Sequence, residues 1–109
     1  MNPEKFVQLD PVIHSRIRLA ILSILISVKE ADFNYLKQMI GTTVGNLSTH
    51  LTKLEEKKYI KVAKGYKGKK PHTSCSLTDK GKQEFSNYLK ALDDLLHFKK
   101  KEKNEGKIF

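Results

Sequence analysis

Apolar residues recur at helical spacing over residues 11–28, and they lie on two sides of the predicted helix. One broad side carries Ile13, Ile17, Ala20, Ile21, Ile24 and Val28. The nearly opposite side carries Leu19, Leu22 and Ile26. Asp10 and Pro11 are a typical cap and first helical residue, so we expect the helix to begin there. Both apolar sides need a cover, and in a chain of 109 residues we expect another copy of the protein to cover the second side.

A second, shorter helix is predicted after a polar break at residues 29–32. Asn34 is its expected cap, and Leu36, Met39 and Ile40 form its expected buried side. Glycine commonly follows the last turn of a helix, so the next residue, Gly41, is expected to end it.

Thr43 is expected to cap a third helix that runs to about Lys57. One narrow stripe of apolar residues is expected to fix this helix against the core, and it consists of Val44, Leu47, Leu51 and Leu54. The opposite side has no bulky apolar residue and carries Gly45, Asn46, Thr49, Thr52 and Lys53. Two helices joined by a short turn that contains glycine form the helix-turn-helix pattern.

In residues 60–63 and 73–77 the side chains alternate as they do in β-strands. The segment between them, residues 65–70, is rich in glycine and lysine and is expected to form a basic loop. The pattern therefore predicts a β-hairpin with a charged tip. Pro71 lacks a backbone donor and is expected at a strand start or edge.

A last helix is predicted from the cap Thr78–Asp79. Its apolar stripe, which would also suit a seam between subunits, consists of Phe85, Tyr88, Leu89, Leu92, Leu95 and Leu96. Beyond Phe98 the residues are mostly polar. We expect one domain at 1–98, followed by a basic, flexible tail at 99–109.

The formal net charge of +9 is concentrated in one segment. Residues 57–72 contain seven lysines and no acidic residue, whereas residues 1–56 carry no net charge. A focused positive patch attracts a polyanion, of which nucleic acid is the commonest. A solubilising lysine surface is the alternative.

The small polar side of the third helix fits the major groove of B-DNA, where base edges present distinct donors and acceptors. Gly45 allows close approach, Asn46 can bind an adenine edge through two atoms, and Thr49 offers a hydroxyl and a methyl group. Near the helix start, where the helix dipole favours anions, the side chains suited to phosphate are Thr42, Thr43, Ser48 and His50. We also assign DNA contact to Lys53, Lys64, Lys67, Lys69 and Lys70.

The chain resembles winged-helix transcriptional regulators related to the MarR and ArsR groups over roughly residues 10–96. The resemblance rests on the segments GTTVGNLSTHLTKLEEKKYIKV and GYKGKKPHTSCSLTDKGKQEF. It implies a mainly α fold with a β-hairpin wing, ordered α-α-α-β-β-α, and a homodimer that binds a palindromic operator with the third helix in the major groove. By the same resemblance the first and last helices build the dimer interface, which we assign to Leu19, Leu22, Ile26, Tyr88, Leu92 and Leu95.

Two departures from that family bear on the site. Relatives often have glycine where this chain has Lys58, and a left-handed lysine there would cost about 1 kcal/mol. Relatives also tend to carry arginine in the wing, where every basic residue of this chain is lysine. Lysine binds phosphate as a point charge, so we expect the wing to position the protein and the third helix to supply specificity.

The remaining reactive residues favour neither a catalytic nor a metal site. The four histidines are scattered without partners at ligand spacing, and Cys75 is expected to be a small packed residue. The sequence leaves two roles open for His50, a phosphate contact or a half-buried position in the helix. It also leaves two roles open for Tyr66, stacking on DNA or covering its own loop. We find no glycine-rich phosphate loop and no nucleophile–base pair, and therefore expect no enzymatic activity, cofactor or metal.

These patterns together favour a sequence-specific transcriptional regulator, a repressor, acting as a homodimer on double-stranded DNA. The alternatives are a winged-helix protein-interaction module and an effector-responsive regulator of the ArsR or MarR type. The single cysteine and the absence of a signal or membrane-spanning pattern predict a cytoplasmic protein.

Overall fold

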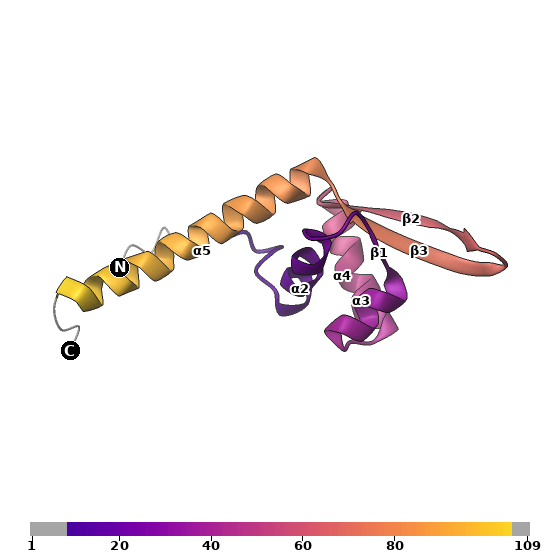
Figure 1. Cartoon of the computed structure of the whole chain (residues 1–109), viewed down its shortest axis with the longest axis horizontal. Coiled ribbons are helices and arrows are strands. Elements are labelled where there is room, and N and C mark those ends of the chain that lie inside the picture. Colours follow the sequence, from indigo (N-terminus) through magenta and orange to yellow (C-terminus); the bar gives the residue numbers. More distant parts are fainter. Residues whose placement is uncertain (1–8, 106–109) are drawn as a thin grey trace.

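The computed structural model describes the backbone of residues 9–105 and the side chains of residues 9–97. The elements follow one another as α2 (Arg16–Leu25), β1 (Ala31–Asp32), α3 (Phe33–Ile40), α4 (Val44–Glu56), β2 (Ile60–Lys67), β3 (Lys70–Leu77) and α5 (Asp79–Glu105). Helices α2, α3 and α4 lie at the centre, the hairpin β2–β3 projects to one side and α5 projects to the other (Figure 1). This is the predicted winged helix-turn-helix arrangement, with one additional short strand.

Helix α2 occupies only the middle of the predicted segment 11–28. Asp10 is not a helix cap, because its Oδ1 accepts a hydrogen bond from the Val12 N–H at 2.8 Å within a turn at residues 11–13. Ser15 caps the helix instead. An aspartate before proline favours a turn as well as a helix start, and the local side-chain hydrogen bond decides for the turn.

The cap of α3 is Asp32 and not Asn34, since Oδ1 of Asp32 accepts from the Tyr35 N–H at 2.7 Å. Aspartate and asparagine are similarly good caps. The choice follows from strand β1, in which Asp32 pairs with Ser74 of β3 and is held in an extended conformation. The predicted polar break at residues 29–32 thus contains a strand of the sheet.

The turn between α3 and α4 agrees with the prediction. Gly41 ends α3 in the left-handed conformation, with φ at 72°. Thr43 caps α4, and its Oγ1 accepts from the Asn46 N–H at 3.1 Å. These two residues fix the angle at which α4 leaves the turn.

Helix α4 ends in the two hydrogen bonds of a Schellman motif. The Tyr59 N–H donates to the Leu54 carbonyl at 3.0 Å, and the Lys58 N–H donates to the Glu55 carbonyl at 2.8 Å. Lys58 occupies the position where glycine is usual and has φ at 63°. The left-handed lysine considered from the sequence is therefore present, with a strain of about 1 kcal/mol.

Strands β2 and β3 form the predicted hairpin, but its tip is tighter than expected. Lys67 pairs with Lys70, which leaves Gly68 and Lys69 as a two-residue turn. Gly68 has φ at 67°, the left-handed conformation that such a turn requires. The prediction of a loop over residues 65–70 is therefore wrong, because most of this segment pairs across the hairpin.

The sheet has the order β1-β3-β2. Strand β1 pairs only with Ser74 and Cys75 of β3, so Pro71 lies where β3 has a neighbour on one side only. Proline is tolerated at such an edge because its missing donor leaves no gap in a central ladder. The outer half of the hairpin therefore extends from the body as a two-stranded ribbon.

Helix α5 begins as predicted, with Thr78 Oγ1 accepting from the Gly81 N–H at 2.9 Å. Gly81 lies against the backbone of Tyr59, and a Cβ at this position would be 2.0 Å from the Tyr59 carbonyl oxygen. The helix runs on to Glu105, past the predicted end of the domain. This continuation is rich in lysine and glutamate, which have high helix propensity. Residues 106–109 of the predicted tail lie outside the described residues.

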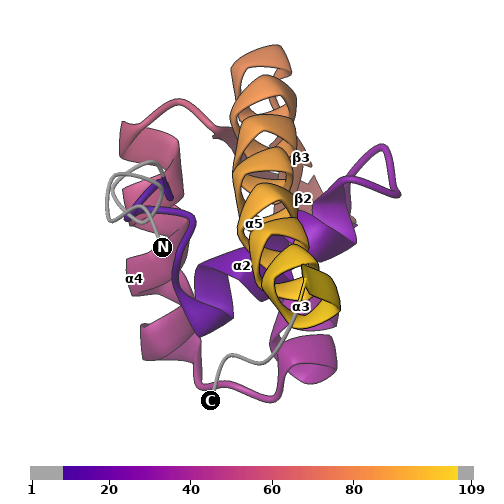
Figure 2. The same ribbon diagram turned by 90° about the vertical axis from the view of Figure 1, so that its left-hand side faces the viewer.

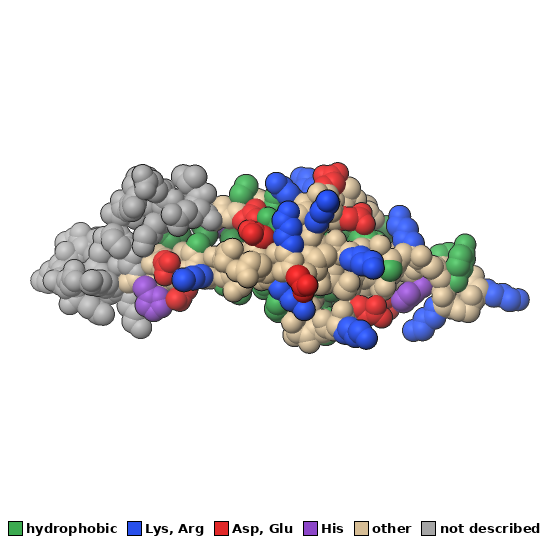
Figure 3. All heavy atoms as spheres, turned by 90° about the horizontal axis from the view of Figure 1, so that it is seen from above, with side chains coloured by type: hydrophobic (Ala, Val, Ile, Leu, Met, Phe, Trp, Pro, Cys, Tyr) green, Lys and Arg blue, Asp and Glu red, His purple; other side chains and the backbone are tan. Residues whose placement is uncertain are grey.

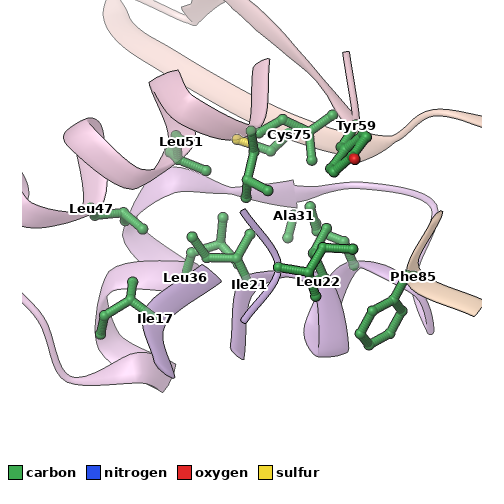
Figure 4. Close-up of a cluster of buried hydrophobic side chains, with 14 of the residues drawn as sticks. Ile17, Ile21, Leu22, Ala31, Leu36, Leu47, Leu51, Tyr59, Cys75 and Phe85 are labelled. Carbon is green, nitrogen blue, oxygen red and sulfur yellow. The ribbon is translucent and has the colours of Figure 1, made fainter. Parts of the chain in front are cut away.

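The core lies between the central helices, the base of the hairpin and the first turns of α5 (Figure 4). Its largest fully buried side chains are Ile13, Ile21, Leu22, Leu25, Leu36, Leu47, Leu54 and Cys75. The prediction of Met39 and Val44 as core residues is wrong, since they are 60% and 56% exposed. Both lie at helix ends next to the turn, and none of the described elements covers them there.

Candidate nucleic-acid interface

The outward side of α4 is exposed and carries small or polar side chains. Gly45, Asn46, Thr49 and Lys53 are exposed, as predicted. Nothing lies within 4 Å of the position that a Cβ on Gly45 would take. The helix is anchored from behind by the buried side chains of Leu47, Leu51 and Leu54. A partner can therefore approach the backbone of α4 closely over its first turns.

Asn46 is oriented by the residue that precedes the cap of α4. Its Nδ2 donates to Thr42 Oγ1 at 2.8 Å. An amide nitrogen has a further N–H group, so one donor and the Oδ1 acceptor remain for a base edge. Adenine presents the matching acceptor and donor in the major groove. Thr42, predicted as a phosphate contact, thus also positions Asn46.

The hydroxyl groups on α4 are partly used within the helix. Thr49 Oγ1 donates to the Gly45 carbonyl at 3.0 Å, and Thr52 Oγ1 donates to the Ser48 carbonyl at 2.9 Å. With its hydroxyl proton directed at the backbone, Thr49 offers its methyl group and an acceptor oxygen to a partner. A methyl group suits contact with the methyl of thymine.

A groove of about 310 Å³ lies between α4 and the hairpin. Its lining comes from α3, α4, β2 and β3 and consists of Phe33, Ser48, Leu51, Thr52, Glu55, Val62, Lys64 and Thr73. Ser48 of α4 and Lys64 of β2 were both predicted as DNA contacts, and the structure brings them to this groove. One flank of α4 and the base of the hairpin therefore share a surface.

The hairpin presents its positive charge to solvent. Lys64, Lys67, Lys69 and Lys70 are exposed, and none of them forms a salt bridge with another described residue. On the face shown in Figure 3, the basic side chains at the hairpin end of the molecule are those of lysines, and no acidic side chain is seen there. Tyr66 is 77% exposed among these lysines, so its ring covers little of its own chain and is free to stack.

The acidic residues of α4 lie at its C-terminal end. Glu55 and Glu56 are both exposed there, and Glu56 lines a shallow hollow together with Thr49 and Lys53. Negative charge repels a polyanion, whereas the N-terminal end of a helix attracts one. The last turn of α4 therefore suits nucleic acid less well than the turns before it.

Arg18 of α2 is a candidate that the sequence pattern did not suggest. Its Nη1 lies 2.8 Å from Nδ1 of His50, which is 32 positions away in the chain, and its Nε donates to the Val12 carbonyl. His50 is half-buried, and burial lowers its pKa, followed by the positive charges of Arg18 and Lys53. No linear motif links Arg18 with His50, because only the packing of α2 on α4 brings them together.

The residues assigned to a dimer interface differ in exposure. Leu22 and Tyr88 are 0% and 3% exposed within one chain, so their assignment to a subunit seam is wrong. Both are already covered by the protein's own core. Ile26 is 47% exposed, and half-buried positions are taken by Leu19, Leu92 and Leu95.

The thiol of Cys75 is a packed core group, as predicted, and is 1% exposed. Burial raises its pKa to about 11, with a further contribution from the charge of Glu55. Within residues 9–97 there is no group of three or more His, Cys, Asp and Glu side chains placed to hold a metal ion. Among the helices that the structure describes, none is long and apolar enough to cross a membrane.

The geometry of a small polar recognition helix beside a basic hairpin defines a winged-helix DNA-binding protein. Residues 17–96 match the family model described as a winged helix DNA-binding domain. The match covers most of the chain, which therefore belongs to the winged helix DNA-binding domain family.

Individual proteins are also similar to this chain. The uncharacterised protein MJ0432 of Methanocaldococcus jannaschii is 36% identical over 78 residues, which are 72% of this chain and 85% of that protein. The structure of a transcriptional regulator homologue from Pyrococcus horikoshii OT3 has a TM-score of 0.80 at 25% identity and covers 86% of this chain and 95% of its own.

A second solved structure, that of ytfH from Salmonella typhimurium, has a TM-score of 0.67 at 26% identity and covers 88% of this chain and 82% of its own. Members of the MarR and ArsR families share the fold with a TM-score of 0.56 each. The fold is thus that of winged-helix transcriptional regulators, as the sequence resemblance implied.

Proposed function

We propose that the protein is a sequence-specific transcriptional regulator that binds operator DNA in the cytoplasm as a homodimer and represses by occupying the operator. The observation that carries this proposal is the shared surface of α4 and the hairpin, which meet at the groove lined by Ser48 and Lys64. A helix with this surface fits the major groove, and the adjoining lysines reach the phosphates beside it.

Base reading is assigned to the N-terminal half of α4. Asn46 keeps a donor and an acceptor after its bond to Thr42, and a good bidentate pair with adenine discriminates by about 1–3 kcal/mol. Gly45 lets the helix backbone approach the bases, and Thr49 supplies a methyl group. The hairpin lysines contribute affinity for any sequence, because a lysine on a phosphate carries no base information.

Dimerisation is assigned to α5, with support from Ile26 of α2. Leu89 and Leu96 are 45% and 60% exposed on α5, although they belong to the apolar stripe of that helix. A second copy of the chain would cover these leucines by packing helix against helix. Such a dimer would present two α4 helices to half-sites about 34 Å apart on one face of the duplex.

DNA binding is tested by selecting bound duplexes from a random pool, followed by gel shifts on the selected and scrambled sequences. We expect the Asn46→Ala variant to lose discrimination at one base position, and the Lys69→Ala variant to bind all sequences more weakly to the same degree. A protein that binds no duplex even at low salt would favour the rival function, a winged-helix module that docks another protein.

The homodimer is tested by light scattering at tens of micromolar protein. We expect a dimer for the wild type and a monomer when Leu89 and Leu96 are both replaced by glutamate. The Ser86→Glu variant is the control, because Ser86 is an exposed polar residue of the same helix. A monomeric wild type would contradict the homodimer while leaving DNA binding by single chains open to the gel shift.

A further inference from the structure

The contact between Arg18 and His50 fixes the protonation of the histidine. A guanidinium group only donates hydrogen bonds, so His50 Nδ1, 2.8 Å from Arg18 Nη1, must be the acceptor. An imidazole that accepts at Nδ1 is neutral and carries its proton on Nε2. The lowered pKa of His50, caused by burial and then by Arg18 and Lys53, agrees with a neutral ring.

Donors remain on this cluster after its internal bonds are made. Arg18 uses Nε for the Val12 carbonyl and one Nη1 hydrogen for His50, and a guanidinium has further N–H groups on both terminal nitrogens. His50 keeps its Nε2–H. Lys53 follows His50 by three positions, is exposed, and lies on the same side of α4. Two cations and one neutral donor thus stand next to one another at the protein surface.

The cluster lies on the flank of α4 that faces away from the hairpin. Ser48 and Thr52 face the groove shared with Lys64. On a helix with about 100° per residue, His50 lies roughly opposite these two across the outward side that carries Thr49. A helix in the major groove has a phosphate backbone on each side. With α4 in the groove, the hairpin would adjoin one of these two strands and the Arg18 cluster would adjoin the other.

We propose that Arg18, His50 and Lys53 form a binding site for a backbone phosphate of the DNA strand that the hairpin does not contact. This site rests on the DNA-binding function proposed above and deepens it. Arg18 and Lys53 supply the charge, and His50 supplies a directed neutral hydrogen bond. Phosphates held on both flanks of α4 fix the rotation of the helix in the groove, which sets the base that Asn46 meets.

The first test measures affinity for the selected operator as a function of salt. Each lysine or arginine that neutralises a phosphate contributes about 0.9 to the slope of log K against log salt. We expect Arg18→Gln to lower the slope by about 0.9 and His50→Gln to lower affinity at pH 8 with an unchanged slope. The matched control is Arg16→Gln, since Arg16 is an exposed arginine of the same helix. It should leave both slope and affinity as in the wild type.

The second test replaces single operator phosphates by neutral methylphosphonates. We expect one replacement, on the strand away from the hairpin, to weaken the wild type and the Lys69→Gln variant but not the Arg18→Gln variant. If Arg18→Gln keeps the wild-type slope and the wild-type response to every replacement, Arg18 only ties α2 to α4 and the site is wrong.

Two further measurements show whether a negative result comes from unfolding of the variant or from a wild type that does not bind DNA. Circular dichroism melting shows whether Arg18→Gln is folded at the assay temperature. Should it unfold, Lys53→Gln, which removes the other positive charge of the site at an exposed position, takes its place in the salt and methylphosphonate series. A wild type that binds no unmodified duplex would overturn the proposed function together with this site, whereas an operator-binding wild type with an unaltered Arg18→Gln variant would overturn the site alone.

Discussion

The hairpin β2–β3 and the helix α5 both project from the three central helices, in opposite directions, and present different surfaces (Figures 1 and 2). The hairpin carries exposed lysines and no acidic residue between Ile60 and Leu77. On α5, exposed lysines alternate with acids such as Asp79 and Asp93, and exposed leucines lie between them. An unbalanced positive ribbon suits a polyanion, whereas a mixed and partly apolar helix suits a protein surface.

The two projections also differ in how they are attached. The hairpin continues from the end of α4 through the Schellman motif at Lys58, which a single positive φ controls. Helix α5 is attached by a close backbone contact in which Gly81 lies against Tyr59. The backbone strain at Lys58 is small, whereas the contact between Gly81 and Tyr59 leaves no space for a side chain. Mutations at the two attachments should therefore have very different costs.

The largest effect is expected at the attachment of α5. In the Gly81→Ala variant the new Cβ would lie 2.0 Å from the Tyr59 carbonyl oxygen, so the start of α5 has to move. We expect the free energy of unfolding to fall by about 3 kcal/mol, measured by urea titration.

The matched control for this substitution is Gly45→Ala. Gly45 is also helical, but nothing lies within 4 Å of its Cβ position. We expect this variant to gain up to about 1 kcal/mol, because alanine has the higher helix propensity. Equal stabilities of the two variants would show that the contact between Gly81 and Tyr59 does not restrict α5.

The next effect separates the charge of the hairpin from the charge of α5. We expect the double variant Lys69→Gln, Lys70→Gln to bind operator about tenfold more weakly and to lower the salt slope by about 1.8. The control pair is Lys82→Gln, Lys90→Gln on α5, which makes the same change in net charge at exposed positions. It should leave the slope unaltered, and an equal loss in both pairs would mean that overall charge, not the hairpin, attracts DNA. Fluorescence anisotropy over a range of salt concentrations measures the affinity and the salt slope of each variant.

A smaller and opposite effect is expected at the attachment of the hairpin. The Lys58→Gly variant should be about 1 kcal/mol more stable than the wild type, because φ at 63° is strained for lysine and free for glycine. Its neighbour Lys57 has φ at −81°, so Lys57→Gly should lose stability. Thermal unfolding of the two variants side by side gives the comparison, and a destabilised Lys58→Gly would contradict it.

The smallest effect is a dependence of stability on pH through His50. Its pKa in the folded chain lies below the ordinary value of 6.5, so the unfolded chain binds the proton first as pH falls. The stability that neutral His50 contributes is therefore present above about pH 6.5 and is lost below it. We expect the wild type to lose more stability between pH 8 and pH 5.5 than the His50→Gln variant, as followed by urea titration. The same loss in both proteins would assign the dependence to other groups.

Much of the fold and part of the candidate site could be predicted from local sequence signals. The cap Thr43, the end of α3 at Gly41 and the pairing of the hairpin all depend on neighbours in the chain. Strand β1 could not be predicted, because Ala31 and Asp32 are too few residues to show a period. Arg18 was missed because its partner His50 is distant in the chain.

The sequence by itself determined the order and approximate position of the helices and the hairpin, which side of α4 is free of bulky groups and where the positive charge gathers. These properties follow from periodicity, caps and composition, which act over a few residues. The tertiary structure alone decided that Leu22 and Tyr88 are inside one chain while Leu89 and Leu96 remain exposed. Leucines on two sides of a helix look alike in sequence, and only the packing of distant elements determines which of them are covered.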